Sequence, residues 1–164
     1  MRTTRATVVV GFLLASATWP CPAIAAPSGF GLQFGLTYGD PSEETFQLTD
    51  VVGGIHYIVP LARHVDFAPS VDVGTGAGAL SLSLNANLHV NLAPDAEVGP
   101  YVGAGFSSYT AGPSSDTEDM PDAAGPTAIA GVWFNRHGGT SYSFETRFGF
   151  SGVSKFTALF AVTF

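Results

Sequence analysis

Large apolar residues stand at every second position along most of this chain from residue 30 onward, with small or polar residues between them. Across residues 80–92, Leu, Ala or Val alternates strictly with Ser, Asn or His. A period of two is typical of β-strands with two unlike faces. The same alternation marks five further segments, at residues 30–39, 65–74, 98–107, 142–150 and 156–164. No helical period is sustained after residue 26, so the pattern predicts strands throughout.

Two more segments, 45–59 and 127–134, are strand-like, which brings the expected number of strands to eight. Their phase stays open, because Val51–Val52 and Trp133–Phe134 offer apolar residues in both registers. Turn-forming residues connect the segments at 60–64, 93–97 and 135–139, and variable connections fall at 40–44, 74–79, 111–125 and 151–154. The sequence therefore predicts an all-β chain that folds as an eight-stranded antiparallel up-and-down β-barrel.

The chemistry of the two strand faces indicates what surrounds this barrel. Only 12% of the residues are charged, about half of what soluble domains carry. A soluble barrel places apolar side chains inside and charges outside, whereas the polar faces here consist mainly of Gly, Ser, Asn, Thr and Ala. Such side chains suit a narrow interior, so we expect the apolar faces to meet lipid as a transmembrane barrel. An aromatic girdle is expected from Tyr38, Tyr57, Tyr142 and Trp133, and a soluble barrel is the alternative.

Residues 1–25 have the features of a secretory signal peptide, and residues 26–164 are expected to form one barrel domain. Arg2 and Arg5 precede an apolar run at 6–17, which is too short to span a membrane, and Ala-Ile-Ala ends at residue 25. Cleavage there would remove Cys21 and leave four basic against thirteen acidic residues, a net charge of 4 − 13 = −9. This balance argues against a nucleic-acid partner, and a single cysteine excludes a disulfide framework.

The C-terminal segment carries a resemblance to a known family. Phe164 ends the chain, and apolar residues occupy every second position before it, at Phe156, Ala158, Phe160 and Val162. Together with the signal peptide and eight strands, this resembles the small OmpA/OmpX-type outer-membrane β-barrels of Gram-negative bacteria. The resemblance implies a bacterial outer-membrane location, contact with lipid and lipopolysaccharide, and a monomer. It also implies periplasmic termini and a terminal signal that the outer-membrane assembly machinery reads.

Enzymatic activity is not expected. Some barrels of this architecture modify lipid A, and in the deacylase type a histidine and a serine lie two residues apart on one strand. The nearest candidate here is His89-Val90-Asn91, which lacks the serine nucleophile. His56 is the other strand-borne histidine, and both are expected to be hydrogen-bonded polar residues. We expect no cofactor and no metal centre.

Charged residues at inward positions suggest a network in the barrel interior. Glu145 and Arg147 are two residues apart, so both point inward if Phe144 and Phe148 face lipid. Buried charges must be paired, and we expect Asp66, Asp72 and Lys155 as further members of this network. An interior plug is the favoured interpretation, and a proton or ion path is the alternative.

The connection 111–125 is strongly acidic. Asp116, Glu118, Asp119 and Asp122 lie in it without the ligand spacing of a calcium loop. A solvated outer loop is expected, and a divalent cation shared with lipopolysaccharide or another binding contact is the alternative. The sequence as a whole favours a structural or surface-interaction role through the outer loops. A narrow small-solute channel and a lipid A-modifying enzyme are the alternatives.

Overall fold

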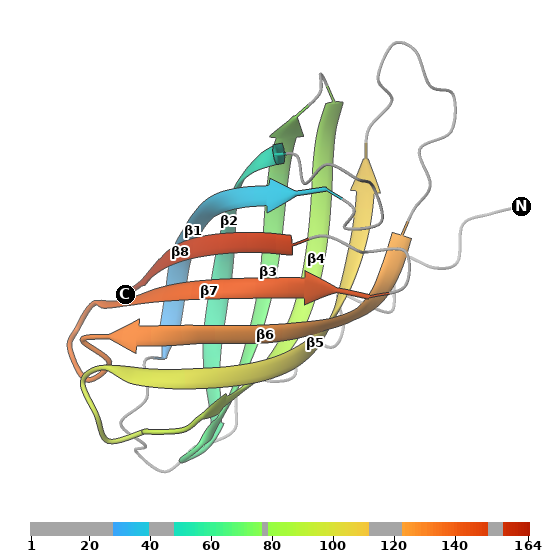
Figure 1. Ribbon diagram of the computed structural model, residues 1–164. Coiled ribbons are helices and arrows are strands. Elements are labelled where there is room, and N and C mark those ends of the chain that lie inside the picture. Colours follow the sequence, from blue (N-terminus) through green and yellow to red (C-terminus); the bar gives the residue numbers. More distant parts are fainter. Residues whose placement is uncertain (1–27, 40–47, 77–78, 112–122, 151–155) are drawn as a thin grey trace, which may run out of the picture.

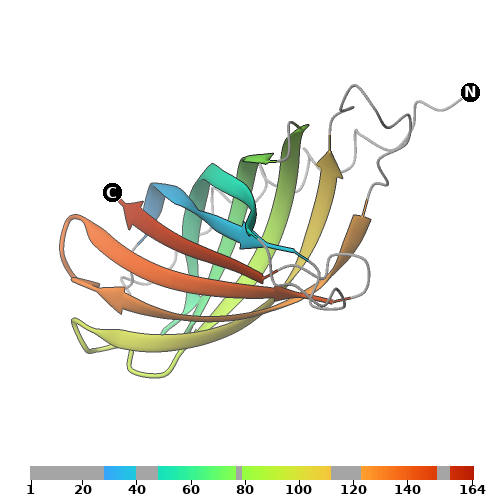
Figure 2. The ribbon, with the colours of Figure 1, turned by 45° about the horizontal axis from the view of Figure 1, so that its top comes forward.

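The computed structural model describes residues 28–39, 48–76, 79–111, 123–150 and 156–164, which form eight strands and no helix. The strands are β1 (Gly29–Tyr38), β2 (Leu48–Ala62), β3 (Val65–Gly76), β4 (Ala79–Asn91), β5 (Gly99–Ala111), β6 (Ala123–Phe134), β7 (Ser141–Gly149) and β8 (Phe156–Thr163). Each strand pairs antiparallel with its neighbours in sequence, and β8 closes the barrel on β1 (Figures 1 and 2). The predicted eight-stranded up-and-down barrel is confirmed. No helix in the described ranges is long and apolar enough to cross a membrane.

Short turns join the strands at one end of the barrel, which we call the turn end. They connect β2 to β3, β4 to β5 and β6 to β7, and the C-terminus lies at the same end (Figure 1). The opposite end, called the loop end here, is where β1, β3, β5 and β7 finish. The predicted signal peptide at 1–25 lies outside the described residues.

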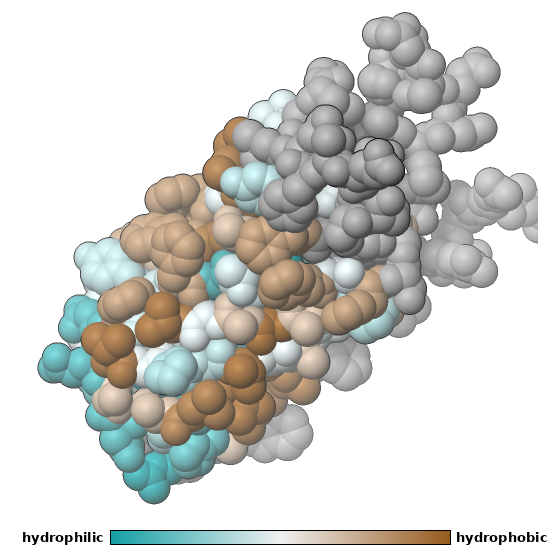
Figure 3. Space-filling model, in the orientation of Figure 1, coloured by the Kyte–Doolittle hydropathy of each residue, from teal (hydrophilic) through white to brown (hydrophobic). Residues whose placement is uncertain are grey.

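The two faces of the barrel wall are inverted relative to a soluble protein. Large apolar side chains are exposed on the outer face, and Figure 3 shows them over the wall, with hydrophilic residues gathered at the turn end. The buried positions are mostly polar, and Gln33, Asn87 and Ser143 are examples. Apolar atoms usually leave water when a protein folds in solution, so this inversion indicates that the outer face has an apolar surrounding.

Strand pairing resolves the phase of β2 and β6. In β2, Asp50, Val52, His56 and Ile58 are buried and Ile55 is exposed, while in β6 the side chains of Thr127, Ile129 and Trp133 are buried and Phe134 is exposed. Glycines on neighbouring strands make room for the larger inward side chains. Added Cβ atoms would lie 2.3 Å from the His56 ring at Gly31 and 2.3 Å from the Tyr101 ring at Gly131.

The expected outward position of Trp133 is wrong. Trp133 is only 1% exposed and stacks inside the barrel on Tyr101, with ring centroids 5.3 Å apart. The residue paired with Trp133 on β5 is Gly99, which has no side chain. Tyr57 and Tyr142 are exposed on the outer face, as expected, and Tyr38 contacts the ring of Phe156.

Candidate functional site

A charged cluster crosses the interior of the barrel, called the lumen below. Arg147 on β7 donates from Nε to Glu145 Oε1 at 2.5 Å and from Nη1 to Asp72 Oδ2 at 3.1 Å. Its Nη1 also lies 3.4 Å from the Ser70 hydroxyl. Asp72 belongs to β3, four strands away in a barrel of eight, so the ion pair spans the lumen. Alternation along β7 places Glu145 and Arg147 on the same inward face.

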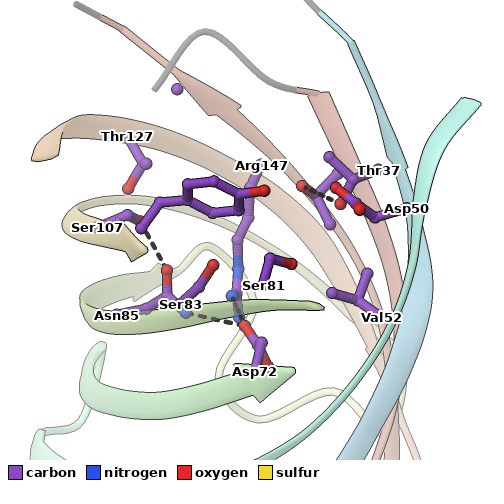
Figure 4. A pocket seen from close by; sticks show the side chains of 13 residues that line it. Thr37, Asp50, Val52, Asp72, Ser81, Ser83, Asn85, Ser107, Thr127 and Arg147 are labelled. Atoms are coloured by element: carbon purple, nitrogen blue, oxygen red, sulfur yellow. Dashed lines mark hydrogen bonds and ion pairs between the residues drawn. The ribbon is translucent and has the colours of Figure 1, made fainter. Parts of the chain in front are cut away.

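Neutral polar side chains complete the shell around Asp72. Gln33 donates to its Oδ1, and Asn85 Nδ2 donates to its Oδ2 at 2.8 Å. Ser107 in turn donates to Asn85 Oδ1 at 2.6 Å, and Figure 4 shows this chain of contacts leading to Asp72 and Arg147. The Asp72 carboxylate therefore accepts hydrogen bonds from three side chains, which satisfy a buried acceptor.

Glu145 also contacts residues that lie nearer to the turn end of the barrel. Tyr101 donates its hydroxyl to Glu145 Oε2 at 2.8 Å, and His89 Nε2 lies 3.4 Å from the same oxygen. Tyr101 lies against both His89 and Trp133, with ring centroids 4.7 Å and 5.3 Å apart. The packed layer beneath the charged cluster consists of Ile58, Ala68, Tyr101, Ile129 and Trp133.

Asp66 belongs to a second ion pair and does not contact Arg147. Arg136 donates from Nη2 to Asp66 Oδ2 at 3.3 Å, and Asn91 Nδ2 donates to the same oxygen at 2.7 Å. Arg136 comes from the turn between β6 and β7, and its backbone N–H donates to the Glu97 carbonyl. Burial lowers the pKa of the Arg136 guanidinium, and the Asp66 carboxylate acts in the opposite direction. Lys155 lies outside the described residues.

Arg136 is the main residue that the sequence analysis missed. It is 1% exposed although it lies in a turn of polar residues. Strand alternation carries no information about a turn residue, and a guanidinium on a long side chain can reach back into the barrel. The sequence did contain one indirect signal, because the three predicted inward acids, Asp66, Asp72 and Glu145, outnumbered the predicted cations Arg147 and Lys155.

Two cavities lie on either side of the central charged cluster, and Arg147 lines both. The larger, near the loop end, has a volume of about 50 Å³ and is lined by hydroxyl groups, Asp50, Asp72 and Asn85 (Figure 4). We call it the loop-end cavity. The smaller, of about 10 Å³, lies among His56, His89, Glu145 and Trp133.

One ring nitrogen of His56 has a hydrogen-bond partner, whereas both ring nitrogens of His89 are buried without one. His56 Nε2 lies 2.8 Å from the Thr163 hydroxyl, and both side chains are buried. Asn91, at the position that would carry a nucleophile, donates to Asp66. Within the described ranges, no three His, Cys, Asp or Glu residues are arranged to hold a metal ion. The hydrogen bonds of His56 and Asn91 help to stabilise a filled interior.

The structure describes the C-terminal strand but not the acidic residues of the connection 111–125. Phe160 on β8 contacts the rings of Phe34, Tyr142 and Phe144, and Phe156 contacts those of Tyr38 and Phe148. The backbone N–H of Phe164 donates to the Phe30 carbonyl at 2.9 Å, while its side chain is exposed. Recognition of Phe156, Phe160, Val162 and Phe164 as an assembly signal stays a prediction. Asp116, Glu118, Asp119 and Asp122 lie outside the described residues.

No protein-family model and no curated protein sequence matches the chain. Among solved structures, Neisserial surface protein A is similar, with a TM-score of 0.60 and 15% sequence identity over 82% of this chain and 96% of that one. The N-terminal β-barrel domain of Pseudomonas aeruginosa OprF gives a TM-score of 0.56 and 17% identity over 84% of this chain and 96% of that domain. In its fold, this chain is thus a small eight-stranded barrel of the outer-membrane type.

Proposed function

We propose that this protein is an outer-membrane β-barrel of bacteria with a closed, self-paired lumen and a structural or surface-interaction role at its loop end. The observation that carries the proposal is the inversion of the wall, apolar outside and polar inside. The strands have 8 to 15 residues, and all but β8 reach the roughly 9 residues that a tilted strand needs to cross a bilayer. Membrane lipid and lipopolysaccharide then surround the apolar wall. Because one closed barrel has no free strand edge for a second subunit to cover, a monomer is expected.

We infer export and assembly from the residue patterns at 1–25 and 156–164. Residues 1–25 act as the signal peptide, and both termini of the barrel lie in the periplasm. The outer-membrane assembly machinery recognises Phe164 together with Phe156, Phe160 and Val162. These assignments rest on the residue pattern and on the outward face that β8 presents.

Deletion of Phe164 tests this assembly step. Processing of the signal peptide should continue, but the barrel should fail to reach the outer membrane, as measured by heat-modifiable mobility in detergent gels. A Phe164→Tyr variant, which keeps an aromatic side chain at the last position, serves as the control. Unchanged folding and outer-membrane yield without Phe164 would exclude it as the recognition residue.

The buried ion pairs favour a plugged lumen over a channel. Arg147 and Arg136 each hold a carboxylate across the interior, and a packed apolar and aromatic layer lies near them. Purified barrels in planar bilayers should therefore show no stable single-channel conductance. Discrete, reproducible openings would favour the alternative of a narrow solute channel.

The histidine contacts favour a non-enzymatic role over lipid A modification, because neither His56 nor His89 contacts an exposed nucleophile. Mass spectra of lipid A from cells with and without the protein should be the same. A mass difference that His89→Ala abolishes would establish an enzyme instead.

A further inference from the structure

Four buried nitrogen atoms beside the smaller lumen cavity, called the inner cavity here, have no hydrogen-bond partner among the described residues. They are both ring nitrogens of His89, Nδ1 of His56 and the indole Nε1 of Trp133. The three side chains are 1% to 5% exposed, and all of them line the inner cavity. His89 Nε2 lies 3.4 Å from Glu145 Oε2 without forming a hydrogen bond to it. Buried polar groups normally have a partner, so these nitrogens indicate a ligand that they share.

The size and the charge of the inner cavity limit what that ligand can be. Its volume of about 10 Å³ has room for roughly one water molecule and for nothing larger. Glu145 and Arg147 both line the cavity, and they pair with each other at 2.5 Å between Oε1 and Nε. Because these two charges balance one another at the cavity wall, a neutral ligand fits the site better than an ion.

The hydrogen-bonding chemistry of the nitrogens selects among neutral ligands. The indole N–H of Trp133 can only donate, whereas a neutral imidazole has one donor nitrogen and one acceptor nitrogen. The ligand must therefore accept a hydrogen bond from Trp133 and also be able to donate one to a histidine. Water does both within the volume of one small molecule, and buried water normally makes about three such contacts.

We propose that the inner cavity binds one water molecule that Trp133, His56 and His89 share. This water joins two parts of the lumen that have no direct side-chain contact through these histidines. His56 Nε2 lies 2.8 Å from the Thr163 hydroxyl on β8, and His89 lies beside Glu145 of the central charged cluster. The bound water thus connects the strand that closes the barrel to the ion pairs across its interior, and it gives the indole of Trp133 a polar partner on the inward side.

Nuclear magnetic resonance of the barrel in lipid nanodiscs tests this proposal. A Trp19→Phe parent leaves Trp133 as the source of a single indole N–H signal. We expect a nuclear Overhauser cross-peak from this proton to the water resonance, with the sign of a water molecule that tumbles with the protein. Ala161→Val should abolish the cross-peak and shift the indole proton upfield, because Ala161 is buried and lines the inner cavity, so added methyl groups displace the water. Ala68→Val, at a second buried lining position, is the alternative variant if Ala161→Val does not fold.

Two control variants separate bound water from other sources of the cross-peak. Thr127→Val changes a buried lumen residue that lines the loop-end cavity and not the inner one, so the cross-peak should persist. Ser143→Ala removes an exchangeable hydroxyl proton from the residue paired with Trp133, and the cross-peak should persist there too. Heat-modifiable mobility shows that each variant is folded. Absence of the cross-peak in the parent would overturn the proposal, as would its loss in Ser143→Ala or its persistence in a folded cavity-filling variant. These results are independent of the surface role, because the spectra need only the folded lumen.

Discussion

At the scale of single residues, Arg147 is the side chain on which most buried contacts depend. Arg147→Ala would leave Glu145 and Asp72 without their cation in a lumen that water reaches poorly. We expect a loss of about 3–5 kcal/mol in the free energy of unfolding, measured by urea titration in lipid vesicles. Arg63→Ala is the control, because that arginine forms an exposed ion pair with Asp95 and exposed pairs contribute little.

A double substitution distinguishes pairing from general damage. Glu145→Leu combined with Arg147→Leu should recover part of the stability, since Asp72 keeps its hydrogen bonds from Gln33 and Asn85. If the double variant loses as much as the two single losses added together, Glu145 and Arg147 do not stabilise one another.

Trp133 provides a test of which side chains meet lipid. It is the one tryptophan outside residues 1–25, and it lies in the lumen. Brominated acyl chains should therefore quench its fluorescence weakly. In a Trp133→Phe, Phe134→Trp variant the indole lies on the exposed outer face and should be quenched strongly. Equal quenching in the two proteins would contradict the inward position of Trp133.

Sequence alternation could predict inward positions but not contacts between them. Asp66, Asp72, Glu145 and Arg147 all lie on the polar face, as their parity indicated. The sequence could not show that Asp66 has a partner from a turn, because pairing across a lumen depends on shear and tilt, which strand-by-strand patterns do not contain. Trp133 was misplaced because Trp133–Phe134 offers apolar residues in both registers, and only pairing with the neighbouring strands decides between them.

At the scale of strands, the ladder between β2 and β3 has a weak point at Pro69. His56 pairs with Ser70 and Val59 pairs with Phe67, but no pair is formed between them. Proline lacks the N–H that the ladder needs, and an unpaired carbonyl is costly where water is absent. Pro69→Val should raise the free energy of unfolding by about 1 kcal/mol in vesicle-based urea titrations.

Pro126→Val is the control for this strand prediction. Pro126 also lies on a strand, but it keeps its pair with Phe106, and its carbonyl accepts from the Phe150 N–H. Its replacement should change stability little. A gain of the same size at both positions would show that the effect does not come from the missing ladder pair at Pro69, because the unfolded chain alone favours proline.

Strand number and most strand phases followed from the sequence, while β2 and β6 needed the structure. β6 begins at Ala123, four residues before the predicted start at residue 127. Residues 123–126 are Ala, Ala, Gly and Pro and carry little apolar signal, but they pair with residues 106–109 of β5. In β2, adjacent valines obscured the alternation, and only pairing with β1 places Val52 inward. Closure of the barrel therefore supplies register information that a single segment lacks.

At the scale of the whole molecule, the up-and-down topology determines which connections share an end. The turn at 135–140 lies at the turn end, and the segment 112–122 joins β5 to β6 at the loop end. If the C-terminus is periplasmic, the turn end faces the periplasm and the loop end faces the outside of the cell. The segment 112–122 is rich in Pro, Ser and acidic residues, a composition typical of exposed connections, where proteases cut.

Protease added to intact cells should therefore cleave between Ser114 and Asp122 and leave the 135–140 turn uncut. That turn is also protected by its own contacts, since Arg136 is buried against Asp66 and Asn135 donates to the Thr140 carbonyl. The control is a cell preparation with a permeabilised outer membrane, in which an Arg136→Ala variant should become sensitive at the turn while the parent stays more resistant. Cleavage at 135–140 but not at 112–122 in intact cells would reverse the topology, because the two connections lie at opposite ends of one closed barrel.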